Sequence, residues 1–568
     1  MNTLIINKLP NTMTVMSFCL AAIALFSCSD DKVVGDPAKD WNSSEERYTP
    51  VDENAFLTYF KPALGRVGDP MPFYDQKAGN FKVMYLQDYD DNAKYCFHPY
   101  WGVQTTDGCN YQSIGEVLAV GSNDYQQDAA LGTGCCYYNE SEGLYYIYYT
   151  GENPDCKDRQ VVMRATSTDF KTWTRDNLWQ LHGPDYGYSG WDFRDPQIFV
   201  ADDGLYHMVI STAPSYGGDP KFADFKSADM KNWEHVGQFN MVWERMCECP
   251  DVFKMGDWWY LVFSEGQAVN WSRKMKYVKA KSWEELKACL NDPKVWPDYK
   301  EGVLDSRGFY AGKTASNGTD RYIWGWCPYR SGADIDAKNV NVGAGGEPNW
   351  GGALVCHKII QHEDGTISLG EVPAMAAKYN KQQNLQVVAS NGYDNSRLTG
   401  EGAYVMFNRL GYHNHISMTV KTEGDADRFG ISLVRSANAK KYYTMMVNPE
   451  ADGAKRKVNF EQEGEEGKGF IEAIDGYEVP RPEDNTYQID IYTDNSVCVM
   501  YINDNVCYTN RIYGIQNNNW SINSYGGAVT VSNVKVTQYY INTIMNVWGI
   551  NIIKGLAAVM MFSLPSNN

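Results

Sequence analysis

The chain has 568 residues and a formal net charge of −19, and its 14% aromatic content includes 40 Tyr and 17 Trp. Length alone predicts roughly two to four domains. The acidic charge argues against nucleic acid or an anionic membrane surface as a partner, and the aromatic content excludes a disordered chain. No phosphate-binding glycine motif of the GxxxxGK[ST] or GxGxxG type is present, which argues against a nucleotide-dependent enzyme.

The N-terminus has the features of a secretory signal peptide. Lys8 precedes an apolar run over residues 15–26, and this run ends in the sequence Leu25-Phe-Ser-Cys28. That ending resembles a bacterial lipobox, in which the Cys becomes the lipidated first residue, and the following Ser29-Asp-Asp31 resembles a surface-export signal. We therefore expect a lipoprotein signal peptide over residues 1–27, lipidation at Cys28, a tether over residues 28–55 and anchoring to the bacterial outer membrane, facing the surface or the periplasm. A plain secreted protein is the alternative.

Beyond residue 56 the sequence is typical of short strands separated by turns. Residues 81–87, 144–150, 205–210 and 258–263 are runs of β-branched and aromatic residues bounded by Gly, Asp or Asn. Such runs predict strands that are buried on both faces. Residues 282–290 form the one clear helical pattern. The sequence therefore predicts an all-β fold.

An internal repeat indicates how these strands are grouped. Residues 166–175 match residues 226–235, and Asp195-Pro-Gln-Ile-Phe199 is echoed by residues 249–253 and 69–73. A repeated unit of roughly sixty residues with about four strands is typical of a β-propeller blade. We therefore predict a five-bladed β-propeller over residues 56–370, in which the starts of the first strands converge on a central channel.

Three acids stand beside the Pro-containing strand starts of this repeat, namely Asp69, Asp195 and Glu248. Because Pro196 disfavours a helical conformation at Asp195, we expect Asp195 at the entrance of a strand, with Arg194 balancing its charge. Two carboxylates facing one another across a funnel can cleave a glycosidic bond, and a third can hold sugar hydroxyls. The alternative is that repeats share turn acids for structural reasons.

Neither a metal nor a cofactor is expected from the sequence. The chain has 14 Cys, but their spacing shows no CxxC pair and no metal-binding pattern with His. Most cysteines are expected to be small buried apolar residues, and a few long-range disulfides remain open.

The C-terminal third predicts a second domain. Residues 488–503 have a strand–turn–strand pattern around residues 494–495, and residues 521–531 have another with Gly526-Gly527 at the turn. We expect a β-sandwich over residues 380–538 that packs on the propeller, with carbohydrate binding as the alternative role. Residues 539–568 form an apolar-rich tail that polar residues interrupt, so that a membrane span is weakly supported.

Several motifs resemble glycoside hydrolase family 32, the β-fructosidases, in the order in which that family has them. Residues 191–196 resemble its FRDP box, and residues 248–251 resemble its ECPD box. Residues 304–311, 321–326 and 350–354 resemble its D-x-G-x-D-F-Y-A, R-x-x-W-G-W and W-x-G-x-L segments. The resemblance spans about residues 60–540 and implies a five-bladed propeller followed by a β-sandwich.

The resemblance also implies roles for individual residues in a retaining glycoside hydrolase that needs no cofactor. Asp69 would be the nucleophile, Glu248 the acid/base and Asp195 the residue that stabilises the transition state, with Arg194 beside it. The residues implied in substrate binding are Arg194, Gln87, Trp101, Phe309 and Tyr310. The chain departs from the family at residues 68–72, where N-D-P-N-G is usual, and at residues 307–308.

The implied substrates are β-fructosides such as levan, inulin or fructo-oligosaccharides, and the protein is expected to act as a monomer without nucleic acid. The departures leave two alternatives open. One is a related five-bladed enzyme, such as a family 43 arabinosidase or xylosidase. The other is a surface lipoprotein that binds glycans without cleaving them.

Overall fold

A computed structural model describes residues 56–89, 98–265, 274–297, 301–306, 308–328, 350–424, 428–435, 442–449, 455–463, 470–480, 482–512, 515–516 and 518–539. The predicted signal peptide, Cys28, the tether and residues 540–568 of the predicted tail lie outside these ranges. Among the described residues, no helix is long and apolar enough to cross a bilayer.

The first part of the chain consists of five consecutive groups of antiparallel strands. Group 1 is β1 (Arg66–Asp75), β2 (Asn80–Asp88), β3 (Tyr100–Thr105) and β4 (Gln112–Leu118); group 2 is β5 (Ala130–Asn139), β6 (Leu144–Glu152), β7 (Gln160–Ser167) and β8 (Thr174–His182). Group 3 is β9 (Tyr188–Val200), β10 (Tyr206–Pro214), β11 (Lys221–Ser227) and β12 (Glu234–Asn240). Group 4 is β13 (Cys247–Met255), β14 (Trp258–Glu265) and β15 (Lys274–Ala280), and group 5 is β16 (Tyr310–Ser316), β17 (Arg321–Pro328), β18 (Gly352–Gln361) and β19 (Ile367–Gly370).

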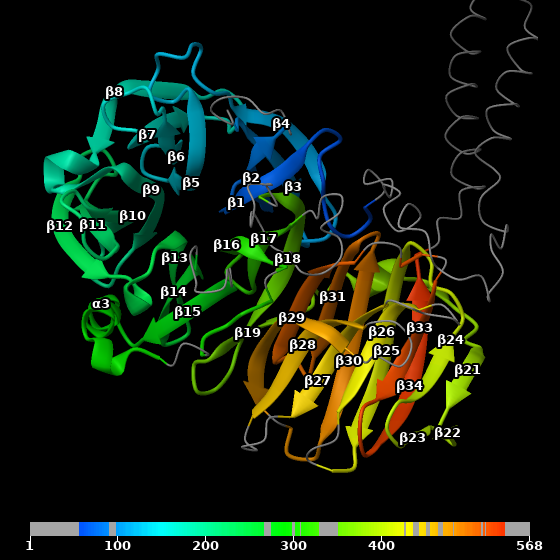
Figure 1. Cartoon of the computed structure of the whole chain (residues 1–568). Coiled ribbons are helices and arrows are strands. Elements are labelled where there is room, and N and C mark those ends of the chain that lie inside the picture. Colours follow the sequence, from blue (N-terminus) through cyan, green and yellow to red (C-terminus); the bar gives the residue numbers. More distant parts are fainter. Residues whose placement is uncertain are drawn as a thin grey trace, which may run out of the picture.

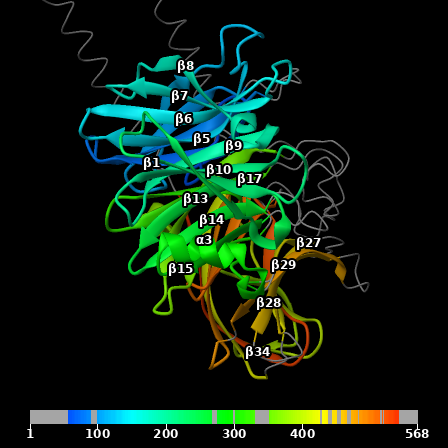
Figure 2. The ribbon, with the colours of Figure 1, turned by 90° about the vertical axis from the view of Figure 1, so that its left-hand side faces the viewer.

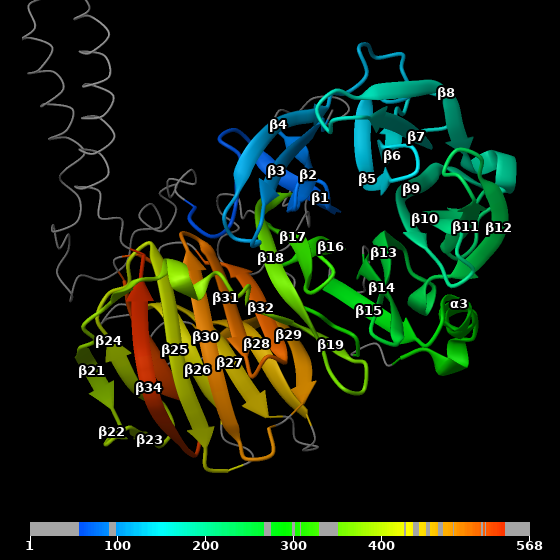
Figure 3. The same ribbon diagram turned by 180° about the vertical axis from the view of Figure 1, so that it is seen from behind.

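The first strands of the five groups lie next to one another. Strand β1 contacts β5, β5 contacts β9, β9 contacts β13, β13 contacts β16, and β16 contacts β1. Groups 5 and 1 are also joined in one sheet by the pairing of Val67 with Gly352. Figure 1 shows the groups following one another around a common centre, and Figure 3 shows the same order from behind. The prediction of an all-β chain is confirmed, whereas the number of blades stays a prediction.

The second strand of each of the first four groups is buried along nearly its whole length, as the apolar runs predict. The predicted helix is α3 (Trp283–Asn291), and Ser282 caps it by accepting a hydrogen bond from the backbone N–H of Glu285. Trp283, Leu286 and Leu290 of this helix pack into a core cluster with strands of groups 3 and 4. Short 3₁₀ helices lie at Gly183–Tyr186, Val242–Glu244, Pro293–Val295 and Ala376–Lys378.

The sequence repeat corresponds to a repeated turn after the third strand of groups 2 and 3. Asp169 accepts hydrogen bonds from the backbone N–H groups of Lys171 and Thr172, and Asp229 does the same for the equivalent residues. In each turn a Ser hydroxyl donates to the same carboxylate at 3.0 Å. The matched segments therefore fold identically because one Asp satisfies the same backbone donors in both.

The second part of the chain consists of two sheets that pack face to face. One sheet has the order β22-β23-β34-β25-β30-β31-β32, with β20 paired to β34, and the other has the order β21-β24-β33-β26-β27-β28-β29. The strands are β20 (Lys381–Gln382), β21 (Val387–Asn391), β22 (Tyr393–Asp394), β23 (Arg397–Thr399), β24 (Ala403–Phe407), β25 (His413–Thr422), β26 (Phe429–Arg435), β27 (Tyr442–Pro449), β28 (Lys455–Glu463), β29 (Phe470–Pro480), β30 (Thr486–Asp494), β31 (Val497–Ile502), β32 (Val506–Arg511), β33 (Asn519–Ser524) and β34 (Ala528–Gln538). Residues from both sheets form one core cluster, as in a β-sandwich.

One of the two predicted hairpins in this part is confirmed, and the other is wrong. Strands β30 and β31 pair directly on either side of a tight turn. Strands β33 and β34 lie in different sheets, and the chain crosses from one sheet to the other at Gly526 and Gly527, whose φ angles are 140° and 76°. The two strands cannot pair because β33 already has β24 and β26 on its two sides, and β34 has β23 and β25.

Buried polar groups join the two parts. Asp494 is fully buried and accepts hydrogen bonds from the backbone N–H groups of Leu57, Thr58 and Tyr59 at 2.7–3.0 Å. Arg511 of β32 donates to the backbone carbonyls of residues 327 and 328 at the end of β17. Figure 2 shows the second part beneath the stacked groups of the first part. Since these donors and acceptors satisfy each other without water, the two parts are held in a defined arrangement.

Candidate active site

The first strand of every group has an irregularity at the same level. The strand pairing shifts between Gly68 and Met71, between Gly132 and Gly134, between Arg194 and Gln197, between Glu248 and Asp251, and between Tyr310 and Lys313. Four of these shifts set two residues against one on the second strand, which is the geometry of a β-bulge. A bulge re-aims the local side chains, so these five sites can point toward the shared centre.

This geometry corrects the predicted position of Asp195. The residue lies in the middle of β9, at the bulge, with a φ of 60°, and not at the entrance of a strand. A proline inside a strand is tolerated at a bulge because the missing N–H leaves no ladder bond unmade there. Pro70, Pro196 and Pro250 all stand at these irregularities, so the repeated proline marks a bulge and not a strand start.

The bulges surround a cavity of about 390 Å³. Asp69, Asp195 and Glu248 all line it, together with Arg194 and Tyr310. The remaining lining residues are Leu86, His98, Leu131, Gly132, Thr133, Thr150, Glu152, Arg159, Gln160, Trp191, Asp192, Cys249 and Trp350. The structure therefore brings together the three acids that sequence analysis selected from three separate groups.

Asp69 is oriented by two donors from other groups. The Thr133 hydroxyl of β5 donates to Asp69 Oδ2 at 2.7 Å, and the Trp326 indole N–H of β17 donates to Asp69 Oδ1 at 2.9 Å. The carboxylate is half-buried. Together the two bonds fix the plane of the carboxylate at the cavity wall.

Glu248 is also held at both oxygens. Arg194 Nη2 lies 3.0 Å from Glu248 Oε1, and the Tyr310 hydroxyl donates to Glu248 Oε2 at 2.7 Å. Arg194 additionally donates to Asp192 Oδ1 at 2.8 Å, and its Nε lies 4.0 Å from Asp195 Oδ2. One guanidinium thus lies near three carboxylates and balances part of their charge. The Tyr310 hydroxyl gives Glu248 a second hydrogen-bond donor, which carries no charge.

Asp195 is the most buried of the three acids, with 3% of its surface exposed. Its Oδ2 accepts the backbone N–H of Cys249 at 2.8 Å, and its own backbone N–H donates to the Thr150 hydroxyl. Burial raises the pKa of Asp195 to about 6; Arg194 opposes this shift, whereas the nearby Glu248 and Asp69 add to it. The pKa of this carboxyl is therefore well above the ordinary range of an aspartate.

Three of the residues predicted to bind substrate do not line the cavity. Gln87 donates to the backbone carbonyl of Leu64 at 2.8 Å, and because Leu86 faces the cavity, the next residue along the strand faces away. Trp101 packs against a core cluster that contains residues of both parts of the chain. Phe309 has 0% of its surface exposed, and its ring packs 4.8 Å from that of His357. Arg307 lies outside the described residues.

The cavity contains residues that sequence analysis missed. Thr133 occupies the bulge of group 2. Its separation along the chain from the second strand of its group is similar to that of Asp69 and Asp195, and this spacing could have identified Thr133 as a cavity residue from the sequence. Trp191 lines the cavity with 60% of its surface exposed. Nothing in the sequence pattern indicates that His98 and Trp350 stack at a ring distance of 4.5 Å beside it.

The structure explains two departures from the N-D-P-N-G pattern. A Cβ atom at Gly68 would lie 2.1 Å from the ring of Trp350, so no larger residue fits there while Trp350 holds this position. Met71 is buried, and its sulfur lies 3.1 Å from the backbone nitrogen of Gly134 in the neighbouring strand. The glycine and the methionine are therefore adapted to their packing partners, while the Asp between them still reaches the cavity.

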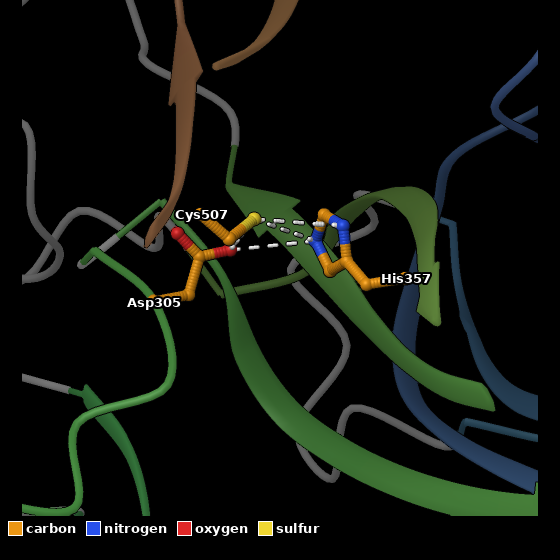
Figure 4. Close-up of side chains that lie close together, drawn as sticks. All are labelled: Asp305, His357 and Cys507. Atoms are coloured by element: carbon orange, nitrogen blue, oxygen red, sulfur yellow. Dashed lines mark hydrogen bonds and ion pairs between the residues drawn. The ribbon is translucent and has the colours of Figure 1, made fainter. Parts of the chain in front are cut away.

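Two clusters in the described part of the chain have donor atoms close enough for a metal ion. They are Asp305 with His357 and Cys507, shown in Figure 4, and Glu371 with His415 and Asp490. In the first cluster His357 Nε2 lies 3.3 Å from Asp305 Oδ2, and Thr509 also donates to that carboxylate. Neither cluster lines the acid cavity, so the chemistry of that cavity is derived from its carboxylates alone.

Comparison with known proteins identifies the family. The model of the glycosyl hydrolases family 32 N-terminal domain matches residues 59–373, which is more than half of the chain. The chain belongs to glycoside hydrolase family 32. The model of the GH32, BT1760-like, C-terminal domain matches residues 365–536. The resemblance deduced from the motifs is therefore confirmed.

Solved structures of this family have the same fold at low sequence identity. The β-fructofuranosidase of Bombyx mori has a TM-score of 0.61 and 15% identity over 93% of this chain and 99% of its own. Fructan 1-exohydrolase IIa of Cichorium intybus has a TM-score of 0.66 and 14% identity over 86% and 98%. The raffinose invertase of Escherichia coli is 28% identical over 176 residues, but the match spans 29% of this chain and only 35% of that relative.

The raised pKa of Asp195 predicts a pH-dependent stability. The folded chain holds a proton on Asp195 between its ordinary value of 3.8 and about 6, where the unfolded chain has lost it, so stability falls as pH rises through this window. The Asp195→Asn variant has no such proton to lose, so its free energy of unfolding should not fall in this way. The difference in free energy of unfolding between the variant and wild type should therefore be larger at pH 7.5 than at pH 4, by up to about 3 kcal/mol. Thermal unfolding of both proteins across this range measures the difference.

The matched control is Asp192→Asn, which removes a 49% exposed carboxylate from the same arginine. Its stability difference from wild type should stay nearly constant with pH. A difference for Asp195→Asn that is equally constant would show that Asp195 titrates at an ordinary pH.

Proposed function

We propose that this chain is a retaining glycoside hydrolase that cleaves β-fructosides, with fructans or fructo-oligosaccharides as substrates. The observation that carries the proposal is the cavity itself, in which Asp69, Asp195 and Glu248 meet with a different set of donors on each. We also infer that the five strand groups are the blades of a five-bladed propeller, whose first strands carry the bulges around one channel.

In the proposed mechanism, Asp69 attacks the anomeric carbon of the fructosyl unit while Glu248 protonates the leaving oxygen. A covalent glycosyl–enzyme intermediate forms, and the leaving sugar departs with that proton. Glu248 then takes a proton from water, whose oxygen attacks the anomeric carbon, and Asp69 is released as a carboxylate. The configuration is retained because the carbon is inverted twice.

The remaining cavity residues have different supporting roles in this mechanism. Thr133 and Trp326 hold the Asp69 carboxylate in a fixed orientation for attack. Asp195 lines the cavity and is placed to hold sugar hydroxyls, and a hydroxyl that donates to it would favour its ionised form. Arg194 and Tyr310 stabilise Glu248 after it has given up its proton.

The choice of fructosides is supported by the relatives. A solved complex of the Bombyx mori enzyme contains sucrose, and one of the fructofuranosidase of Schwanniomyces occidentalis contains fructosylnystose. These ligands share a terminal fructosyl unit, which would occupy the acid cavity here. Membership of family 32 leaves the family 43 alternative without support, and the glycan-binding alternative is decided by the assay below.

Trp191 is the side chain that we propose to contact the next sugar. Its ring is 60% exposed at the cavity wall, and the Arg159 guanidinium lies 5.4 Å from the ring centroid. Arg159 is held in turn by Glu152, whose carboxylate accepts from Arg159 Nε at 2.9 Å. A ring that is fixed on one side and open on the other is suited to stacking against a sugar face.

We further propose that the protein is a monomer anchored to the bacterial outer membrane through a lipid on Cys28. The support is the apolar run that ends in Leu25-Phe-Ser-Cys28. Fatty-acid labelling of the wild-type protein in the producing cells should be lost in a Cys28→Ala variant, and equal labelling of both proteins would contradict this anchor.

Replacing either reacting carboxylate should abolish turnover. With sucrose, raffinose, levan and inulin as substrates, Asp69→Asn and Glu248→Ala should each lower kcat by at least about 10³-fold, because each removes one of the two groups that make or break bonds. Released fructose measures the rate, and far-ultraviolet circular dichroism checks that both variants fold.

The matched control is Glu244→Ala, an exposed acid just ahead of Glu248 that does not line the cavity, and it should keep wild-type activity. Near wild-type turnover in Asp69→Asn would overturn the nucleophile assignment. Binding of a fructan by the wild-type protein without release of sugar would favour a glycan-binding protein.

The stacking role of Trp191 predicts a selective effect on substrate affinity. Trp191→Ala should raise KM for fructo-oligosaccharides roughly tenfold, and Trp191→Phe should raise it less, since a smaller ring retains part of the contact. The melting temperature should stay close to that of wild type because the side chain is exposed. An unchanged KM in Trp191→Ala would exclude this contact.

A further inference from the structure

The segment between β15 and β16 is docked on the second part of the chain. Asp305 Oδ1 accepts the backbone N–H of Thr509 at 2.8 Å, and Asp305 Oδ2 accepts the Thr509 hydroxyl at 2.5 Å. The hydroxyl of Ser306 donates to the carbonyl of the same Thr509. A Cβ atom at Gly308 would lie 2.0 Å from that carbonyl oxygen, so the two backbones touch there. One residue of β32 thus holds three residues of this segment.

The contact between this segment and Thr509 is buried, and a further set of hydrogen bonds lies behind it. Asp305, His357 and Ser306 are each fully buried, and Asp305 Oδ2 lies 3.3 Å from His357 Nε2 (Figure 4). His357 Nδ1 shares a hydrogen bond of 2.8 Å with the hydroxyl of Tyr501 on β31, so the second part also orients this imidazole. Because no water reaches these groups, a lost bond cannot be replaced by solvent.

This docked segment leads directly to the acid cavity. The ring of Phe309 packs 4.8 Å from that of His357, and Tyr310 follows as the first residue of β16. The Tyr310 hydroxyl donates to Glu248 Oε2 at 2.7 Å. The contacts therefore run without a break from Thr509, through Asp305, His357 and Phe309, to the partner of the proposed acid/base.

We propose that Thr509 is a positioning residue for the reaction: through Asp305 and Ser306, the second part of the chain sets where Tyr310 meets Glu248. This inference rests on the proposed function for its kinetic consequence. The Tyr310 hydroxyl and the Arg194 guanidinium each bond one oxygen of Glu248, so the placement of Tyr310 affects how Glu248 is oriented and how readily it gives up its proton. The two-sheet part thus has a role in catalysis beyond support of the fold.

The first test removes one hydroxyl at the docking point. Thr509→Val keeps the shape of the side chain but loses the hydrogen bonds of the hydroxyl with Asp305 Oδ2 and with His357 Nε2. We expect kcat for fructo-oligosaccharides to fall about tenfold or more with KM changed less than about twofold, because a small displacement near a reacting group costs mainly rate. The basic limb of the pH–rate profile should move to higher pH as Glu248 loses its donor, and Thr509→Ser should restore both properties.

The matched control is Tyr492→Phe. Tyr492 lies on β30 of the same sheet, and its hydroxyl donates to Glu371 Oε2 at 2.7 Å, just beyond the end of β19. The variant loses one hydrogen bond with the first part but touches neither Asp305 nor Tyr310. Both variants should lower the melting temperature by a few degrees, and only Thr509→Val should alter kcat and the pH profile. Equal kinetics in the two variants would overturn the proposal.

A double variant identifies the route of the effect. If Thr509 acts through Tyr310, Thr509→Val should add little to the loss of kcat caused by Tyr310→Phe, since the bond it positions is already gone. If the fold-loss of kcat in the double variant equals the product of the fold-losses in the two single variants, Thr509 acts by another path, and the proposal is overturned.

Hydrogen exchange separates this inference from the proposed function. Peptides that cover the start of β16 should exchange faster in Thr509→Val than in Tyr492→Phe, whether or not the protein turns over a fructoside. If the wild-type protein releases no sugar while this difference is present, the proposed function fails and the docking role stands. Equal exchange in both variants contradicts the docking role itself.

Discussion

The candidate site depends on how three carboxylates are kept in one cavity. Like charges at close range repel, and burial makes each charge harder to maintain. The structure resolves this by giving each acid a different set of donors. Asp69 has a hydroxyl and an indole N–H, Glu248 has a guanidinium and a phenol, and Asp195 has a backbone N–H with Arg194 at 4.0 Å. The three carboxylates of one cavity thereby have unequal surroundings, and a two-carboxylate mechanism needs such a difference between its acid and its nucleophile.

The hydrogen-bond donors to the three acids come from strand groups that are far apart in the sequence, so the site depends on how these groups are assembled. Thr133 comes from group 2, Arg194 from group 3, and Trp326 and Tyr310 from group 5. The end of β17 in group 5 accepts hydrogen bonds from Arg511 of the two-sheet part, and the segment that leads into β16 is joined to that part through Asp305. A displacement of the second part would therefore be transmitted to the strand that carries the partner of Glu248.

The sequence predicted the local features well wherever one strand or turn decides them. Apolar runs located the buried second strands, and Asp169 and Asp229 stand in turns with the same hydrogen bonds. Errors arose where a pattern has two structural readings. The dipeptide Asp195-Pro196 is typical of a turn, but proline also occurs in β-bulges, and here it lies in one. The pair Gly526-Gly527 is typical of a hairpin turn, but here it connects two strands of different sheets. Only the neighbours of each strand distinguish these readings.

By itself, the sequence determined the all-β class, the repeat and the three acids, because hydrophobic period and repeated motifs are local properties of a chain. It also placed the chain in family 32 through short boxes that survive at low overall identity. The tertiary structure alone decided which side chains meet those acids. Gln87 turns away because Leu86 takes the cavity face, and Trp350 reaches the cavity because Gly68 leaves room for its ring. Such outcomes depend on contacts between residues far apart in the chain, which no local pattern encodes.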